Sequence, residues 1–337
     1  MYDNDMDLRT KVYQMFMIAP QQTELLVGGN LENALKSGLG GVIFFTRNIL
    51  TIEQTKDFIS QIKKTAILYP FIGIDEEGGR VERTENVFGG KKFLSAKYQA
   101  EKGLDFVRLQ TSEIANLIKK MGFNMNFAPV LDVNTNPQNP IIGERAYGKN
   151  VKDVEEYAIC AMKTYLENNI IPVGKHFPGH GDVNLDSHLA LPSLSLTKDE
   201  IEQVHIKPFK KAIELGIPAI MVAHLLCPTL TKQELPSSLS SEILSYLRNE
   251  LNFKGLIVSD DMQMGALSGI APVEAVIQGI CAGVNLFLYR ESTADVINII
   301  EQTYQRVLND KFLREKVEDS FVLTQKIKLS YSKFLSS

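Results

Sequence analysis

The chain has 337 residues, of which 44% are hydrophobic and 23% charged, and its formal net charge is −4. This composition is typical of a globular enzyme with a large core, and the slight negative charge argues against nucleic-acid binding and against an electrostatic membrane anchor. The acidic N-terminus lacks a signal-peptide pattern, and no run of about 18 uncharged apolar residues occurs, so we expect no membrane span and a cytoplasmic location.

Short apolar runs typical of strands recur along the chain, and most are followed by a segment with helical periodicity. The eight runs are Met15–Ile18, Gly41–Phe45, Phe71–Ile74, Asn124–Phe127, Ile171–Gly174, Ala219–Val222, Leu256–Ser259 and Asn285–Tyr289. The helical segments are Thr51–Ala66, Ala96–Met121, Val151–Glu167, Thr197–Leu215, Ser240–Leu251 and Pro272–Ala282, with the last helices at about 292–330. Eight such units predict an α/β fold, a single (β/α)8 TIM-type barrel that forms one domain over residues 1–337. A doubly wound open sheet is the alternative, but no GxGxxG motif follows the first strand to support its dinucleotide-binding form.

Ionisable residues stand where several of these strands end. Asp75 follows the third strand, Lys175 and His176 the fifth, His224 the sixth, and the pair Asp260-Asp261 the seventh. A single aspartate at a strand end can simply cap the next helix. Repeated cases predict an active site at the C-terminal ends of the barrel strands, where the loops of such barrels carry catalytic residues.

Asp260 comes directly after an apolar strand, so its carboxylate should project into the mouth of the barrel. A carboxylate there can be a nucleophile, a metal ligand or a helix cap. Its neighbour Asp261 could take the capping role, which favours chemistry for Asp260.

The stretch 174–192 holds three of the five histidines. Within it, Asp186 can orient the imidazole of His188 and favour its protonated form, which would make His188 a general acid and base. A Ser-His-Asp hydrolase is disfavoured because no GxSxG motif occurs. A metal site is also disfavoured, because HxH and HExxH are absent and Lys175 beside His176 would repel a cation. For His180 we expect a structural hydrogen bond.

Carboxylates and arginines are concentrated in two segments, 75–83 and 139–148. This combination suits a hydroxyl-rich ligand such as a sugar. Three acidic residues in the first segment are expected to be a solvated charge cluster, namely Glu76, Glu77 and Glu82. Since there is no Trp, an aromatic platform for a sugar would have to come from Phe177, Tyr147 or Tyr289. The three cysteines are expected to be buried, reduced thiols.

Taken together, Lys175-His176-Phe-Pro-Gly-His-Gly and Asp186-Ser-His188 resemble the signature of the β-N-acetylhexosaminidases of glycoside hydrolase family 3. The resemblance continues, in the order of the family and over about residues 13 to 290, in the segments 40–48, 75–83, 126–133, 142–148, 221–224, 259–262 and 282–284. Asn285 departs from it, because aspartate is expected there. Glu76 and Glu144 also stand where other residues are expected.

The resemblance implies a retaining exo-β-N-acetylglucosaminidase that needs no metal and no organic cofactor. By position, Asp260 corresponds to the nucleophile, His188 to the general acid/base and Asp186 to the residue that orients it. The sugar-binding residues would be Asp75, Arg83, Arg145, Lys175 and His176. For cytoplasmic members the family implies removal of terminal β-linked N-acetylglucosamine from peptidoglycan fragments during cell-wall recycling.

Two other functions remain open at this point. One is phosphorolysis of the same bond, because a neutral or cationic acid/base repels phosphate less than a glutamate would. The other is a non-catalytic sugar-binding protein on the same fold, which the presence of Asp260, His188 and Asp186 disfavours. The expected partner is a small carbohydrate, with no nucleic acid and no membrane, and the expected state is a monomer.

Overall fold

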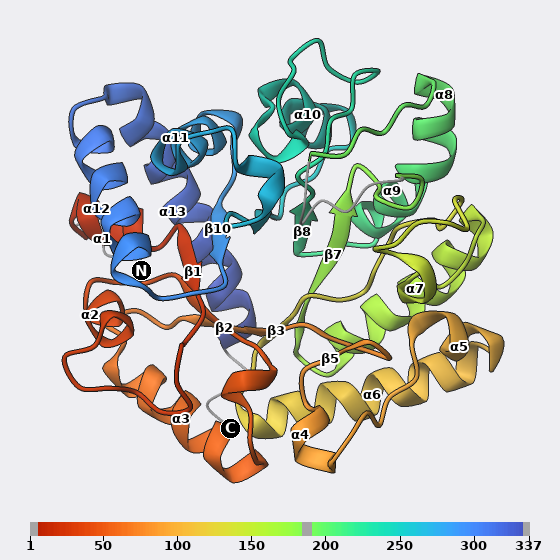
Figure 1. Ribbon diagram of the computed structural model, residues 1–337, viewed down its shortest axis with the longest axis horizontal. Helices are drawn as coiled ribbons and strands as arrows, with labels where there is room; N and C mark the ends of the chain where they lie inside the picture. Colours follow the sequence, from red (N-terminus) through yellow and green to blue (C-terminus); the bar gives the residue numbers. More distant parts are fainter. Residues whose placement is uncertain (1–5, 184–190, 333–337) are drawn as a thin grey trace.

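The computed structural model describes residues 6–183 and 191–332. Within these residues, eight parallel strands close a barrel in the order β1-β10-β9-β8-β7-β6-β3-β2, and helices surround it (Figure 1). The barrel strands are β1 (Phe16–Ile18), β2 (Gly41–Phe44), β3 (Phe71–Ile74), β6 (Met125–Asn126), β7 (Ile171–Phe177), β8 (Ala219–Val222), β9 (Leu256–Asp261) and β10 (Leu286–Tyr289). All eight predicted strands and the predicted (β/α)8 barrel are confirmed.

The α-helices of the described residues lie in the predicted segments, with three short additions, two before β2 and one at residues 85–88. They are α1 (Leu8–Tyr13), α2 (Asn30–Lys36), α3 (Ile52–Thr65), α4 (Glu85–Phe88), α5 (Ala96–Glu101), α6 (Leu104–Met121), α7 (Val151–Glu167), α8 (Lys198–Glu200), α9 (Lys207–Glu214), α10 (Ser241–Ser245), α11 (Pro272–Ala282), α12 (Ala294–Leu308) and α13 (Lys311–Ser332). None of them is both long and apolar enough to cross a membrane.

The segment 96–121 was predicted as one helix, and this was wrong. The chain forms α5 and α6 instead, because Gly103 between them adopts φ +94°, a conformation that ends a helix and that only glycine reaches without strain. The helices that were predicted correctly have clear local causes. For example, the Thr51 side chain caps α3 by accepting a hydrogen bond from the backbone N–H of Gln54.

The inside of the barrel is filled by every second residue of each strand, as the two-residue period of a strand requires. The resulting apolar cluster consists of Met17, Ala19, Ile43, Phe71, Met125, Phe127, Ile171, Val173, Ala219, Met221, Leu256, Val258, Leu286 and Leu288. Space in it is tight, since a Cβ on Gly73 would lie 2.8 Å from the Phe127 ring. The next inward-facing positions toward the C-terminal ends of β2, β3, β7, β9 and β10 are Phe45, Asp75, Lys175, Asp260 and Arg290. The strand period thus places these five side chains above the apolar filling.

The opposite end of the barrel is covered by α13, which passes behind the strands in Figure 1. Its residues Leu323, Ile327 and Tyr331 pack against the apolar cluster inside the barrel. Lys328 is buried there and donates hydrogen bonds to the Gln14 side chain (2.9 Å) and to the Gly40 carbonyl (2.8 Å), close to where β1 and β2 begin. The helix therefore forms the floor of the barrel at the N-terminal ends of the strands.

Two expectations about single residues are settled by the fold. Cys160 and Cys227 are buried free thiols, but Cys281 is exposed, so the expectation that all three are buried was wrong. Asn285 has a structural role. Its side-chain oxygen accepts hydrogen bonds from the Arg248 guanidinium (2.7 Å) and from the Ile257 N–H (2.9 Å), and its amide nitrogen donates to Ser320.

Candidate active site

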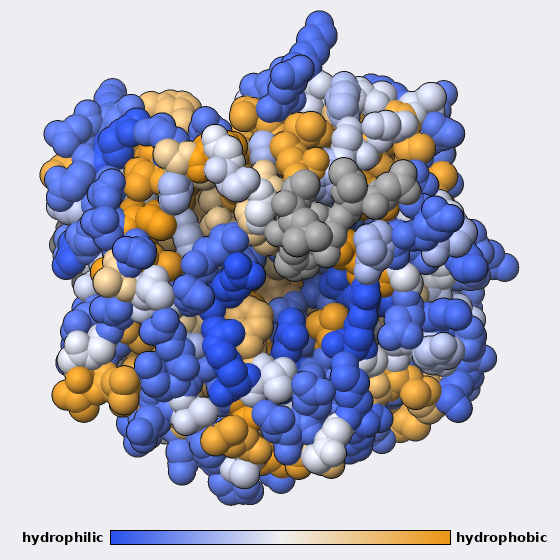
Figure 2. All heavy atoms as spheres, viewed as in Figure 1, coloured by the Kyte–Doolittle hydropathy of each residue, from blue (hydrophilic) through white to orange (hydrophobic). Residues whose placement is uncertain are grey.

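A cavity of about 540 Å³ opens at the C-terminal ends of the strands. Figure 2 shows it as a hollow near the middle of this face, bordered largely by hydrophilic side chains. Its lining includes the six predicted site residues that lie within the described structure, namely Asp75, Arg83, Arg145, Lys175, His176 and Asp260. The other two predicted residues, Asp186 and His188, lie outside the described residues. The structure therefore brings all the describable site residues into one pocket.

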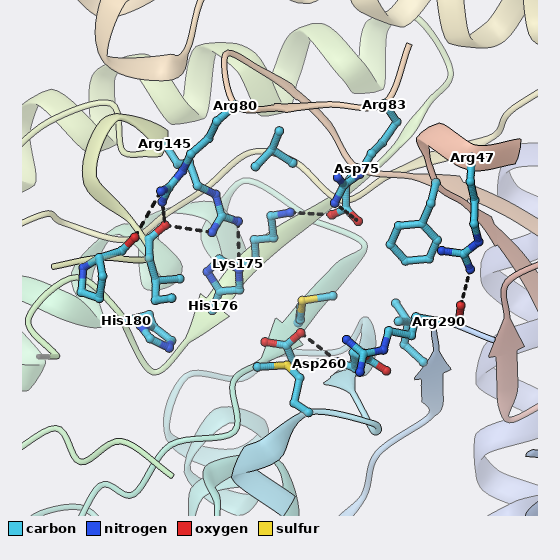
Figure 3. Close-up of a pocket in the computed structure, with 18 residues that line it drawn as sticks. Arg47, Asp75, Arg80, Arg83, Arg145, Lys175, His176, His180, Asp260 and Arg290 are labelled. Atoms are coloured by element: carbon cyan, nitrogen blue, oxygen red, sulfur yellow. Dashed lines mark hydrogen bonds and ion pairs between the residues drawn. The ribbon is translucent and has the colours of Figure 1, made fainter. Parts of the chain in front are cut away.

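One wall of the pocket is an ion-pair network centred on Glu77, a carboxylate that was expected to be solvated. The Glu77 carboxylate accepts two hydrogen bonds from Arg145, each 2.8 Å long, and forms an ion pair of 2.5 Å with Lys175. Lys175 also contacts the Asp75 carboxylate at 2.8 Å (Figure 3). Burial tends to raise the pKa of Glu77, but the two cations outweigh it, so the pKa lies below the ordinary value. The network fixes two long cationic side chains in the pocket.

Glu77 is thus not solvated, and neither are its acidic neighbours. Glu76 and Glu82 are almost completely buried, so the predicted solvated charge cluster was wrong for all three residues. The reason is that β4 (Glu76–Gly78) and β5 (Val81–Glu82) form a small antiparallel sheet beside the barrel. Glu76 pairs with Glu82 in this sheet, so Asp75, which precedes Glu76, and Arg83, which follows Glu82, both lie at the same end of the sheet. The buried glutamates therefore stand next to two of the sugar-binding candidates.

A second network positions His176. The buried Asp132 carboxylate accepts a hydrogen bond from the His176 ring at Nδ1 (2.7 Å) and others from the backbone N–H groups of His176 and His180. Burial alone would raise the pKa of Asp132, but the two histidines and these hydrogen bonds lower it. The expectation of a structural role for His180 is supported, since its N–H binds Asp132 and its carbonyl accepts a hydrogen bond from Asn139. Burial lowers the pKa of the His180 imidazole to about 4.

Asp260 lies on β9, across the pocket from this wall (Figure 3). Burial tends to raise the pKa of its carboxyl, but interactions with His176 and His224 and a 2.8 Å hydrogen bond from the Asp261 N–H lower it below the ordinary value. Asp260 is therefore ionised at neutral pH, as a carboxylate nucleophile must be. The next residue, Asp261, accepts a hydrogen bond from the Gln263 N–H in the turn after β9. It does not take the helix-capping role that was considered for it, because the next helical segments have Met264 and Ala271 at their N-caps.

His224 fixes the backbone at this point. Its Nε2 lies 3.1 Å from the Asp261 carbonyl, which can only accept, so Nε2 carries the proton and Nδ1 accepts from the Ser238 hydroxyl at 2.6 Å. Burial lowers the pKa of His224, in keeping with a neutral ring.

The family to which this chain belongs follows from its similarity to known proteins. The model of the glycosyl hydrolase family 3 N terminal domain matches residues 7–323. The chain belongs to glycosyl hydrolase family 3. It is 33% identical over 272 residues to "Beta-hexosaminidase A" of Pseudoalteromonas piscicida, covering 74% of this chain and 45% of that protein. It is 30% identical over 268 residues to "Beta-hexosaminidase" of Idiomarina loihiensis, covering 78% of this chain and 80% of that protein.

Among solved structures, a family 3 β-N-acetylglucosaminidase from Paenibacillus is 28% identical, with a TM-score of 0.89, over 96% of this chain and 63% of that one. The resemblance drawn from the motifs is confirmed by these family members. The chain spans less than half the length of the Pseudoalteromonas protein and somewhat under two thirds of the Paenibacillus one.

The sequence interpretation missed several pocket residues and misplaced the aromatic one. Phe177, proposed as a stacking platform, is fully buried against Phe209, and Tyr147 and Tyr289 are also buried. Among the described residues, Phe45 contributes the one phenylalanine or tyrosine ring to the pocket lining. Counting by two along β2 would have found it, and the same count along β10 would have found Arg290.

Glu76 offers a test of the support behind the site. One of its oxygens accepts hydrogen bonds from the N–H groups of Arg83 and Thr84, and the other accepts from the Thr84 hydroxyl at 2.9 Å. Burial raises its pKa to about 8, so the folded state binds a proton that the unfolded state releases from about pH 4.5 upwards. Folding stability should therefore fall as the pH rises from 5 to 8. Glu76→Gln removes this loss, because the hydroxyl of Thr84 can reverse and accept from the new amide.

We expect the unfolding free energy of Glu76→Gln, measured by urea denaturation, to exceed that of the wild type by an amount that grows by roughly 3–4 kcal/mol between pH 5 and pH 8. Glu82→Gln is the control. Each oxygen of Glu82 accepts a backbone N–H, from Lys92 and from Phe93, so a glutamine amide would face a donor and should destabilise the fold. A constant difference between Glu76→Gln and the wild type over this pH range would contradict the prediction.

Proposed function

We propose that this protein is a retaining exo-β-N-acetylglucosaminidase that acts on peptidoglycan fragments. The observation that carries the proposal is the ionised Asp260 carboxylate, which shares one pocket with the five residues that correspond to sugar-binding positions in the family. The similar proteins named β-hexosaminidase, and the family 3 β-N-acetylglucosaminidase of similar structure, support the reaction and the sugar. The monomeric state, the cytoplasmic location and the single catalytic domain over residues 1–337 belong to the same proposal.

In the proposed reaction, Asp260 attacks the anomeric carbon while His188, oriented by Asp186, protonates the leaving oxygen. The bond to the leaving group breaks as the Asp260–sugar bond forms, with inversion at that carbon. His188 then takes a proton from water, and this water displaces Asp260 with a second inversion, so that the product keeps the β configuration. Asp75, Arg83, Arg145, Lys175 and His176 would hold the sugar hydroxyl groups and its acetamido group.

The stereochemistry gives the direct test of this proposal. NMR of the first sugar released from an aryl β-N-acetylglucosaminide should show the β anomer, which then mutarotates. First-formed α anomer would overturn the retaining mechanism. The same assay in phosphate buffer separates hydrolysis from phosphorolysis, because a phosphorylase would release the sugar 1-phosphate. Protein that binds N-acetylglucosamine without cleaving the aryl glycoside would point to the non-catalytic alternative.

His188→Ala tests the proton transfer. With a dinitrophenyl glycoside, whose leaving group needs no proton, the rate of glycosidic bond cleavage should fall by less than about 10-fold in the variant. With a poor leaving group such as phenol, the loss should reach roughly 10²–10⁴-fold. Added azide should restore turnover of the dinitrophenyl substrate and give the β-glycosyl azide, because azide needs no general base. Ser187→Ala, the neighbouring substitution, serves as the control. Equal losses on the two substrates would exclude His188 as the acid.

A further inference from the structure

Three arginines border one side of the pocket mouth, and they come from three separate loops. Arg47 follows β2, Arg83 follows β5 and Arg290 follows β10. Figure 3 shows all three on the side of the pocket that lies away from Arg145. Arg47 and Arg290 are exposed, whereas the sugar-binding candidates Lys175 and Arg145 are buried deeper. The side of the pocket nearest to solvent is therefore cationic.

Direct contacts hold these arginines together as a built arrangement. Two guanidinium groups lie over the ring of Phe45, whose centroid is 4.9 Å from Arg47 Cζ and 5.3 Å from Arg83 Cζ. Arg47 also donates a hydrogen bond to the backbone carbonyl of Arg290 at 2.5 Å. Stacking on an aromatic ring and bonding to a carbonyl limit the motion of an arginine without neutralising its charge.

The carboxylates nearby pair with these arginines only weakly. Within residues 6–183 and 191–332, no carboxylate oxygen forms an ion pair with Arg47, and the contact of Arg83 with Asp75 is 3.9 Å long. Arg290 lies 3.4 Å from the Asp261 carboxylate. Glu291 is the remaining acid close to Arg47. Burial lowers the pKa of Arg47, and repulsion from Arg290 and Arg83 adds to this effect, while Glu291 opposes it. By contrast, Lys175 and Arg145 have carboxylate partners at 2.8 Å or less.

We propose that Arg47 and Arg290 bind a carboxylate on the leaving part of the substrate, which makes the enzyme selective for anionic aglycones. This inference rests on the proposed function. The cations that would hold the uncharged N-acetylhexosamine, Lys175 and Arg145, are neutralised by close carboxylate partners. Arg47 and Arg290 are exposed and have no carboxylate partner as close among the described residues, so they keep more of their charge for an anion. An arginine guanidinium matches the geometry of a carboxylate, and a hydrogen bond to a charged group contributes more than a neutral one. Arginines would also bind inorganic phosphate, the acceptor in phosphorolysis, so the test distinguishes a carboxylate on the leaving group from a phosphate acceptor.

The test compares two substrates that differ by one charge. They are the peptidoglycan disaccharide N-acetylglucosaminyl-β-1,4-N-acetylmuramic acid and the same disaccharide with its lactyl carboxylate converted to the amide. For the wild type we expect kcat/KM to be roughly 10–100-fold higher for the acid, the range given by a hydrogen bond to a charged group. In Arg47→Gln and in Arg290→Gln this ratio should fall below about 3-fold, and added salt should lower it in the wild type. The control is Arg306→Gln, an exposed arginine on α12 that pairs with Glu274, and it should keep the wild-type ratio.

Three results would overturn the inference. The first is a wild type that cleaves both disaccharides equally well while still hydrolysing an aryl β-N-acetylglucosaminide, which leaves the proposed function intact. The second is a preference for the acid that persists in Arg47→Gln and Arg290→Gln. The third is a wild type that forms the sugar 1-phosphate when phosphate is added, together with loss of this product in the two variants. That result would show that the arginines bind the phosphate acceptor. A wild type that cleaves none of these glycosides would refute the proposed function, and this inference with it.

Discussion

Asp260→Ala should reduce kcat on aryl β-N-acetylglucosaminides by roughly 10⁴-fold or more, whatever the leaving group. The reason is that no covalent intermediate can form without the carboxylate on β9, so a good leaving group should not restore kcat. Added azide should enter the vacated space and attack the sugar from the side that Asp260 occupied, which gives the α-glycosyl azide. The measurements are steady-state rates with two leaving groups and NMR of the azide product.

Asp261→Asn is the matched control for this substitution. It changes the neighbouring carboxylate, whose oxygen accepts a hydrogen bond from the Gln263 N–H and can be replaced by an amide oxygen. We expect a far smaller loss of kcat in this variant. A β-glycosyl azide from Asp260→Ala, or similar losses in the two variants, would assign the nucleophile elsewhere.

Glu77→Gln should have the largest effect on stability. It leaves the buried cations Lys175 and Arg145 with one fewer negative charge, and breaking a buried ion pair from one side costs about 3–5 kcal/mol. Because the pKa of Glu77 is lowered in the folded state, its contribution is complete above the unfolded pKa and is lost as the pH falls through the folded value. The wild-type advantage over the variant should thus be largest at neutral pH and shrink in acid. Urea denaturation at pH 7 and at pH 4 measures both quantities.

The control for Glu77 is Glu274→Gln. Its carboxylate pairs with Arg306 at 2.5 Å, but both side chains of this pair are about half exposed, so the loss should stay below about 1 kcal/mol. Equal losses in the two variants would show that the network behind the pocket contributes no more than a surface ion pair. We also expect Glu77→Gln to raise KM, because Lys175 and Arg145 would no longer be held in place.

The sequence predicted the barrel well because each strand is a short apolar run followed by an amphipathic helix, a pattern that buried parallel strands require. It also predicted Asp75, Lys175 and Asp260, since ionisable residues that directly follow an apolar run stand out. It could not predict that Glu77 is buried. That depends on Lys175 and Arg145, which lie 98 and 68 residues further along the chain and meet Glu77 only when the barrel closes.

The break between α5 and α6 was missed for a different reason. A lone glycine in an amphipathic segment is tolerated by many helices, so Gly103 alone did not decide the matter. Arg47 is part of the family segment 40–48, but that segment does not show which charged side chains surround Arg47 in the fold. Only the structure shows that Arg290 and Arg83, from distant parts of the chain, lie on the same side of the pocket.

The position of α13 has a practical consequence for handling the protein. The helix runs across the N-terminal ends of the strands, and Lys328 near its end is bonded to residues that precede β1 and β2. The substrate pocket opens at the other ends of the strands. An affinity tag, a fluorophore or a solid support joined to the chain beyond α13 would therefore start from the far side of the barrel and leave the approach to the pocket unobstructed.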